Sequence, residues 1–308
     1  MSEADLIAKL TAGLPTDGSV HVGSGDDCAV MDMGMISDYL LFKTDAIVEG
    51  IHFTADTPPE KIGRKAIARP LSDIAAMGGW PTHALITLGL PEGYDEKRLA
   101  AIYQGAGEMG AAHKTFIVGG ETTRTSELLI SVAMIGECDR MYTLTREGSK
   151  KGNAIFVTGE LGGSLAGKHL DFDPRLEESR WLAQQFDIHA MIDLSDGLAT
   201  DLRHLLGKKL GAELRTPAIP ISRAAREQAK ANPSGKTAIL AALTDGEDYE
   251  LLFTLPANQA VLLHDQWKEK FPDLPLHCIG KITNQPGITL RDNKGVLPLN
   301  VKGYDHLN

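Results

Sequence analysis

Short apolar runs separated by polar turns dominate the pattern of the chain. We expect strands at four such runs, 39–42, 84–90, 154–157 and 190–194. Apolar residues at helical spacing predict helices at 59–78, 95–113 and 175–186. Because both element types occur in each half, we expect α/β or α+β layers throughout.

A basic, glycine-containing segment at 146–152 predicts a boundary between two domains. We place an N-terminal domain at 1–148 and a C-terminal α/β domain at 149–308. The length of 308 residues agrees with two domains of ordinary size.

Several polar side chains follow directly on predicted elements. The strand 39–42 ends at Lys43, Thr44 and Asp45, and 48–53 forms a second extended piece. Glu121 follows two glycines after a strand at 115–118, which we expect to be buried. Asp73 lies just beyond a break that Pro70 should cause in the helix 59–78, because proline lacks the N–H group.

The segment around Asp193, Ser195 and Asp196 joins a buried strand to a helix that begins near Leu198. Open backbone N–H groups at a helix start favour polar ligands. Two carboxylates ~4 Å apart repel by roughly 4 kcal/mol at an effective dielectric constant of ~20, so this turn favours a cation. The alternative is that Ser195 or Asp196 only caps the helix.

Acidic side chains at turns recur along the chain, at Asp26, Asp27, Asp45, Asp73, Glu121, Asp193 and Asp196. Such oxygen ligands suit Mg²⁺, which bridges to phosphates. Each one taken singly could instead be a turn or cap residue. The glycine-rich segment 159–164 is either a phosphate cradle or, as we favour, a plain turn after a strand. His52, between two apolar residues, is by itself typical of a partly buried structural histidine.

Composition excludes several classes of function. The net charge of −10 argues against nucleic acid or an anionic membrane as a partner. No apolar run approaches the ~20 residues that span a bilayer. The start of the chain lacks the pattern of a signal peptide, and Cys28, Cys138 and Cys278 form neither a metal motif nor a disulfide framework. We therefore expect a cytoplasmic protein.

Eight stretches occur in one order along the chain: 25–29, 44–53, 71–78, 119–124, 157–159, 192–198, 246–251 and 303–306. Together they resemble the thiamine-monophosphate kinase family, within a wider group that includes aminoimidazole-ribonucleotide synthetase and selenophosphate synthetase. The resemblance implies a two-domain chain that forms a homodimer through its N-terminal sheets. It also implies ATP and several Mg²⁺ ions between the N-terminal domain and the turn at Asp193. The reaction implied is direct transfer of the ATP γ-phosphoryl group to thiamine monophosphate.

The resemblance further implies roles for particular residues. Metal ions would be held by Asp27, Thr44, Asp45, Asp73, Glu121, Asp193 and Asp196. ATP would contact Gly120, Glu121, Arg146 and Ser195, with Tyr103 as a looser candidate. The thiamine phosphate would face His52, Glu247 and Tyr304. No general base is expected, because the acceptor phosphate is already ionised near neutral pH.

Three positions depart from the pattern of that family. Glu121 stands where aspartate is usual, and Arg69 and Pro70 replace a neutral residue and asparagine. Lys43 stands where serine or threonine is usual, and its ammonium could replace the charge of one metal ion, so we predict fewer bound Mg²⁺ ions. Arg69 either adds a charge near Asp73 or points to solvent. These departures leave open an enzyme with another small phosphate or carboxylate acceptor, and a non-catalytic nucleotide-binding paralogue.

Overall fold

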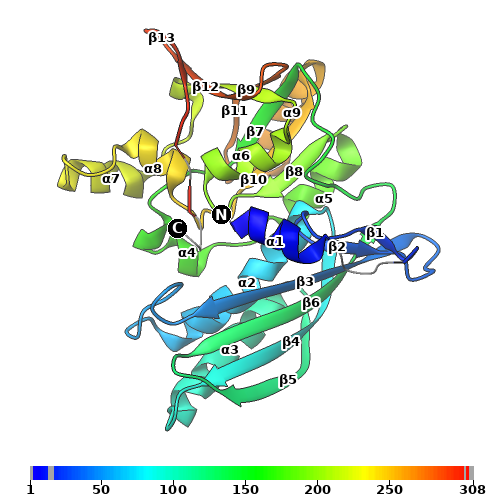
Figure 1. Cartoon of the computed structure of the whole chain (residues 1–308), viewed down its shortest axis with the longest axis vertical. Coiled ribbons are helices and arrows are strands. Elements are labelled where there is room, and N and C mark those ends of the chain that lie inside the picture. The colour runs from blue at the N-terminus through cyan, green and yellow to red at the C-terminus, as the bar shows by residue number, and fades with distance from the viewer. Residues whose placement is uncertain (1–2, 13–16, 302, 305–308) are drawn as a thin grey trace. The chain divides into compact units, whose positions relative to one another are not determined.

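Two separate sheets organise the chain in the computed structural model, which describes residues 3–12, 17–301 and 303–304 (Figure 1). One compact unit, here the N-terminal unit, consists of Pro15–Thr143 and Leu170–Leu176. The other, the C-terminal unit, consists of Met1–Leu14, Leu144–His169 and Glu177–Asn308. The predicted mixture of strands and helices in both halves is confirmed. The division between residues 148 and 149 stays a prediction.

The N-terminal unit contains a six-stranded sheet in the order β1-β2-β3-β6-β4-β5. Its strands are β1 (Val20–Val22), β2 (Ala29–Met31), β3 (Asp38–Val48), β4 (Trp80–Leu90), β5 (Phe116–Arg124) and β6 (Leu129–Asp139). Neighbouring strands are antiparallel except β4 and β5, which are parallel. Strand β5 comes last in this order and is therefore an edge strand, and the chain reaches it from β4 through a helix.

Helices α2 (Pro59–Ala76) and α3 (Glu96–Ala112) lie on one face of this sheet (Figure 1). That inner face carries the buried side chains of Ile47, Ile86 and Ile130, which alternate with exposed positions as strand geometry requires. The two helices approach closely at glycine: a Cβ atom on Gly105 would lie 1.9 Å from the carbonyl oxygen of Glu60. Asp95 caps α3 by accepting a hydrogen bond from the backbone N–H of Lys97.

Four local predictions in this unit are wrong. Strand β3 continues to Val48, so Lys43 and Asp45 lie inside the strand instead of at its end. Residues 49–53 form a turn, closed by the hydrogen bond from Gly50 N–H to the Phe53 carbonyl. Strand β5 is exposed along nearly its whole length, because it lies at the sheet edge. Helix α2 continues through Pro70 without a break, and both Pro70 and the helix residues around it are buried.

The C-terminal unit contains a seven-stranded sheet in the order β13-β12-β9-β11-β7-β10-β8. Its strands are β7 (Asn153–Thr158), β8 (Ala190–Asp193), β9 (Gly211–Arg215), β10 (Leu251–Pro256), β11 (Leu276–Thr283), β12 (Gly287–Asp292) and β13 (Gly295–Pro298). Its helices are α1 (Glu3–Thr11), α4 (Lys168–Asp171, which crosses the unit boundary), α5 (Leu176–Gln185, which begins at it), α6 (Leu198–Leu206), α7 (Arg223–Ala231), α8 (Ala238–Thr244) and α9 (Ala260–Lys270).

Strands β7, β8 and β10 are buried on both faces, so alternate side chains belong to different cores. Ile192 points into one core with residues of α6 and α8. Met191 points into the other with Trp267 of α9 and Leu182 of α5. Burial on both faces explains the continuous apolar runs that predicted these strands. Within the described ranges, no helix has the length and apolar content that crossing a membrane requires.

Candidate functional site

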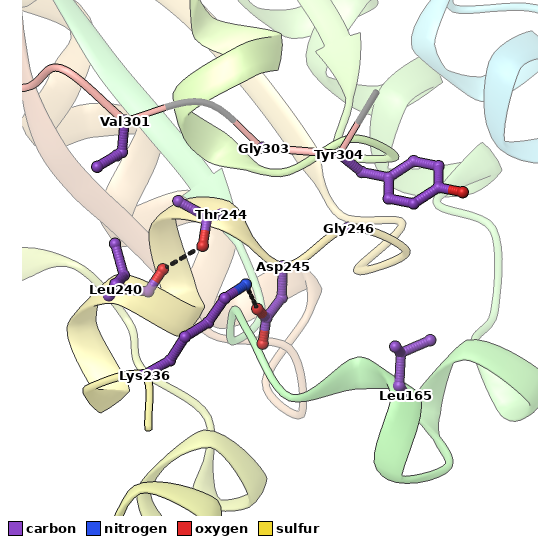
Figure 2. A pocket seen from close by; sticks show the side chains of 9 residues that line it. All are labelled: Leu165, Lys236, Leu240, Thr244, Asp245, Gly246, Val301, Gly303 and Tyr304. Atoms are coloured by element: carbon purple, nitrogen blue, oxygen red, sulfur yellow. Dashed lines mark hydrogen bonds and ion pairs between the residues drawn. The ribbon is translucent and has the colours of Figure 1, made fainter. Parts of the chain in front are cut away.

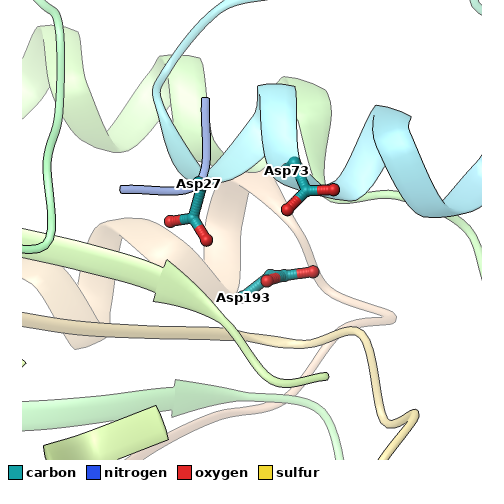
Figure 3. Close-up of side chains that lie close together, drawn as sticks. All are labelled: Asp27, Asp73 and Asp193. Atoms are coloured by element: carbon teal, nitrogen blue, oxygen red, sulfur yellow. The ribbon is translucent and has the colours of Figure 1, made fainter. Parts of the chain in front are cut away.

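Asp27 and Asp73 form a pair of buried carboxylates in the N-terminal unit (Figure 3). Asp27 follows the turn at Gly25, and Asp73 lies on α2. One oxygen of each lies within 4.8 Å of the other. Two ligand oxygens on one Mg²⁺ ion are at most about 4.2 Å apart, so a small closure would let both side chains bind the same ion. Asp26 instead accepts a hydrogen bond from the Asp27 N–H, which is the turn role left open for it.

Two cations of the same unit contact the expected metal ligands. The Lys43 ammonium lies 2.7 Å from Asp73 Oδ1, and the Arg69 guanidinium lies 3.2 Å from Asp45 Oδ1. Burial acts to lower the pKa of Lys43, but the charges of Asp73 and Asp45 outweigh it and raise that pKa above its usual value. Arg69 therefore does not point to solvent, so that alternative is wrong, whereas its effect on the charge close to Asp73 stays a prediction.

The turn after β3 fixes the orientation of His52. Its ring Nδ1 accepts a hydrogen bond from the Val48 N–H at 3.0 Å. The fully buried Lys65 donates from Nζ to the His52 carbonyl oxygen at 2.7 Å. An Nδ1 atom that accepts a hydrogen bond carries no proton, so the ring proton lies on Nε2. His52 is thus set up as a hydrogen-bond donor.

The side chains of Thr44 and Glu121 lie on the opposite, outer face of the sheet. Strand alternation separates Thr44 from Lys43 and Asp45. Glu121 pairs with Thr87 in register and is exposed on β5. The structure therefore does not bring these two side chains to Asp73.

The two ATP candidates of this unit, Gly120 and Tyr103, lie on different elements. Gly120 lies in register with Ile86, in the row of the inner face that also contains Asp45. Tyr103 is partly exposed on α3, and burial raises its pKa.

In the C-terminal unit, Asp193 ends β8 and is buried (Figure 3). The following turn is held by backbone bonds, including the Leu194 N–H to the Glu250 carbonyl oxygen. The N-cap residue of α6 is Gly197, without a side-chain cap. Neither Ser195 nor Asp196 therefore caps the helix, so that alternative is wrong.

Asp201, which sequence reasoning missed, holds this turn from inside α6. Its Oδ2 accepts hydrogen bonds from the N–H groups of Asp196 and Gly197 at 3.1 and 3.0 Å. Burial raises the pKa of Asp201 well above its usual value, and the charges of Asp196 and Asp193 raise it further. The Arg146 guanidinium acts weakly in the opposite direction, which places its positive charge near this turn. The only sequence signal for Asp201 is an acidic residue one helical turn after Gly197.

The two acceptor candidates of this unit bind the same turn through their backbones. The Glu247 N–H donates to the Ser195 carbonyl oxygen at 2.7 Å, and the Tyr304 N–H donates to the Asp196 carbonyl oxygen at 3.0 Å. Glu247 has a left-handed φ of 62°, which is rare for a non-glycine residue and typical of functional turns. Its carboxylate lies 3.0 Å from His169 Nδ1, a contact that no local sequence pattern indicates. Asp305 and His306, at the end of the motif, lie outside the described residues.

The glycine-rich segment 159–164 is the plain turn that we favoured. Asp248 accepts a hydrogen bond from the Gly162 N–H, and Asp245 accepts one from the Gly163 N–H. These amides are therefore bonded to the protein's own carboxylates. Burial raises the pKa of Asp248 to about 7, against the opposing charge of Lys168.

A pocket of about 540 Å³ lies beside Tyr304 in the C-terminal unit (Figure 2). Leu165, Leu240 and Val301 give it apolar walls. Lys236 and Asp245, bonded to each other at 2.8 Å, give it a polar side. Its volume suits a small organic molecule.

Comparison with known proteins gives matches over most of the chain. The family described as AIR synthase related protein, N-terminal domain, matches residues 25–138. The thiamine-monophosphate kinase of Rhodopirellula baltica is 38% identical over 282 residues, which cover 88% of this chain and 86% of that one. The resemblance drawn from the eight stretches is thereby confirmed.

Solved structures agree with the match to thiamine-monophosphate kinases. The complex of AaThiL with AMPPCP and TMP matches with a TM-score of 0.81 and 30% identity, over 99% of this chain and 97% of that one. The Escherichia coli hydrogenase maturation protein HypE matches with a TM-score of 0.72 over 97% of this chain and 98% of its own. At 19% identity, that second likeness concerns the fold alone.

Proposed function

Because this chain belongs to the thiamine-monophosphate kinase family, it is a kinase, and we propose that it transfers the γ-phosphoryl group of ATP to thiamine monophosphate, giving thiamine diphosphate. The observation that carries the proposal is the likeness to AaThiL over nearly the whole length of both chains. AaThiL was solved with AMPPCP, an ATP analogue, and TMP, so that complex holds a counterpart of each proposed reactant.

The chemistry requires little more than positioning and charge neutralisation. Both reactants are polyanions, and phosphoryl transfer depends mainly on holding donor and acceptor in line. The acceptor phosphate is already ionised, so no side chain has to remove a proton from it. The orientation of His52 supports this, because its Nε2–H can donate to a phosphate oxygen but its Nδ1 is occupied by Val48.

We propose that Asp27, Asp73, Asp193 and Asp196 supply oxygen ligands to Mg²⁺. Bound Mg²⁺ would offset the repulsion between the two phosphates. The spacing of Asp27 and Asp73 supports this assignment. Thr44, Asp45 and Glu121 have less support as ligands and stay predictions from the resemblance.

For ATP, we propose contacts with Gly120, Arg146 and Ser195, with Tyr103 still a looser candidate. A Cβ atom on Gly120 would lie 1.8 Å from the Ile86 carbonyl oxygen, so only glycine fits this place in the sheet. The positive charge of Arg146 near the Asp196 turn suits a polyphosphate.

For the acceptor, we propose His52 and Glu247 at the polar groups and Tyr304 at the cationic thiazolium ring. Tyr304 is 48% exposed and lines the pocket of Figure 2, and the face of an aromatic ring attracts a cation. The Glu247 carboxylate is already oriented by His169, which reduces the entropy that binding would cost.

We further propose that two copies pair through the outer face of the N-terminal sheet. This face carries Phe42, Leu85 and Phe116, which are 48%, 47% and 63% exposed. Phe116 is in register with His83, and the two rings lie 6.0 Å apart. Such an apolar face is typical of a protein interface.

A cytoplasmic location is proposed on the cysteines. All three are free, and Cys28 and Cys138 are buried. Burial, followed by the charge of Asp73, raises the pKa of Cys28 well above its usual value, so this thiol is unreactive. Free thiols are usual in a reducing compartment.

A second candidate is a related enzyme with another small phosphate or carboxylate acceptor, and a third is a non-catalytic nucleotide-binding protein. The ion pairs of Lys43 and Arg69 motivate both, because they change the charge around Asp73 and Asp45. ATP turnover without consumption of thiamine monophosphate would favour the second. Tight ATP binding without transfer to any offered acceptor would favour the third.

The test is an assay of ATP and thiamine monophosphate, with thiamine diphosphate separated by chromatography. The native chain should form the product, and Asp73→Asn and Asp193→Asn should each lower the rate at least 100-fold while the far-ultraviolet spectrum stays native. Full activity in either variant would contradict the metal assignment.

A further inference from the structure

Two positively charged side chains lie at the carboxylates that the metal assignment depends on. Lys43 contacts Asp73, and Arg69 contacts Asp45, all within the N-terminal unit. We propose that Lys43 and Arg69 are permanent cations of the phosphate-binding site, which take the place of metal ions at Asp45 and at one oxygen of Asp73. The proposal rests on the proposed function and adds to it a smaller complement of divalent ions.

Lys43 lies beside two of the carboxylates that the resemblance assigns to metal ions, Asp45 and Asp73. Strand alternation puts it on the inner face of β3 with Asp45. Only 22% of its side chain is exposed, against 10% for Asp73, so water screens the pair weakly. Its ammonium lies 2.7 Å from Asp73 Oδ1, where a positive charge offsets that carboxylate directly.

Arg69 is fixed by two neighbouring acceptors. One Nη donates to the Ala46 carbonyl oxygen at 3.0 Å, and the other lies 3.2 Å from Asp45 Oδ1. The same Oδ1 accepts the Ala46 N–H at 2.9 Å. An oxygen that already accepts two donors, one of them charged, is a poor ligand for a divalent ion. Oδ1 of Asp45 therefore serves as the counter-charge of Arg69.

The charge balance follows from these pairs. Asp27, Asp45 and Asp73 carry a formal charge of −3, and Lys43 and Arg69 reduce it to −1. A site of charge −1 attracts fewer divalent ions than a site of charge −3. One oxygen of Asp27 and one of Asp73 still lie within 4.8 Å of each other, so we expect metal binding to be reduced and not abolished.

The experiment counts metal ions directly. Mn²⁺ is titrated into the full-length protein with AMPPCP and without thiamine monophosphate, and free Mn²⁺ is read by electron paramagnetic resonance. Lys43→Ser and Arg69→Gln should each bind one more Mn²⁺ per chain than the native protein, or bind the existing ions at least 10-fold more tightly. The double variant should show both effects.

Matched controls separate charge from folding. Lys43→Arg keeps the charge and should keep the native count. Lys61→Ser removes an exposed lysine that pairs with Asp171 at 2.6 Å in the same unit, and should also leave the count unchanged. If Lys43→Ser does not fold, Arg69→Gln decides the matter through the separate pair at Asp45.

An unchanged Mn²⁺ number and affinity in folded Lys43→Ser and Arg69→Gln would overturn the proposal and leave the two pairs as structural contacts. Formation of thiamine diphosphate by the native chain is measured separately. A native chain that makes the product while its variants bind metal normally refutes this inference alone. A native chain that makes no product refutes the proposed function instead.

Discussion

His52 illustrates how backbone contacts decide the chemistry of a single residue. The Val48 N–H occupies Nδ1, and Lys65 binds the carbonyl group, so the ring proton lies on Nε2. Sequence alone favoured a structural histidine here, because its apolar neighbours Ile51 and Phe53 hide the polar role. The hydrogen bond that fixes the tautomer comes from the backbone N–H of Val48, so the side-chain pattern of the sequence does not predict it.

Replacing His52 by two amides tests this orientation. The amide of His52→Gln reaches about as far as Nε2 and should retain acceptor binding within about 10-fold. The shorter His52→Asn should raise the KM for thiamine monophosphate more strongly, by roughly 1–3 kcal/mol for a lost hydrogen bond to a charged group. Steady-state kinetics over a range of acceptor concentrations measure both, and equal KM values for the two variants would argue against an Nε2 donor.

The Asp248 carboxyl group should give the protein a recognisable pH dependence. Its pKa is raised to about 7 by burial, so the folded state holds a proton that the unfolded state releases near pH 4. The stabilisation from this group is fully present below about pH 4 and is lost as the pH rises towards 7. Asp248→Asn cannot titrate, so its stability relative to the native chain should improve on the order of 2 kcal/mol between pH 5 and 7.5. Urea unfolding at both pH values measures this, and a difference that does not change with pH would contradict it.

At the scale of elements, the strand predictions were accurate where the strands are buried on both faces. β7 and β8 are apolar on both faces and were predicted nearly to their bounds. β5 was predicted to be buried because its first residues are apolar, yet it is an exposed edge strand. An apolar run in the sequence does not distinguish a strand in the core from an exposed strand at the edge of a sheet. Pro70 likewise did not break α2, because the packing around it outweighs the lost hydrogen bond.

Helix α3 contains a matched pair of glycines, one packed against α2 and one not. Gly105→Ala would place its Cβ atom 1.9 Å from the Glu60 carbonyl oxygen, and backbone must move to admit it. We expect a loss of roughly 1–3 kcal/mol in the free energy of unfolding. Gly107→Ala, in the same helix, has no atom within 4 Å of its Cβ atom and should stabilise by about 0.5–1 kcal/mol. Urea denaturation compares the two, and an equal effect would refute close packing at Gly105.

At the scale of the whole molecule, the sequence supplied the carboxylates but not their partners. Asp27, Asp73 and Asp193 stood out because they occupy turns or helix positions beside apolar strands. Arg69–Asp45 and Glu247–His169 could not be predicted, because each pair joins residues far apart in the sequence. The predicted domain division at 148 and 149 is untested, and the compact units differ from it by placing Met1–Leu14 with the C-terminal sheet.

The proposed dimer depends on the outer face of the N-terminal sheet. Leu85→Glu puts a charge at a 47% exposed apolar position on that face and should give monomers in analytical ultracentrifugation. Val261→Glu, at a 74% exposed position on α9, is the matched control and should leave the assembly unchanged. A native chain that sediments as a monomer, or a Leu85→Glu variant that still dimerises, would rule out this interface.

The most direct test of the central claim follows the transferred group itself. The native chain is incubated with Mg²⁺, thiamine monophosphate and ATP labelled with ³²P in the γ-phosphate. We predict that the label appears in thiamine diphosphate, with one ADP formed for each labelled product. Label recovered only in inorganic phosphate, or ATP left unconsumed, would contradict the account.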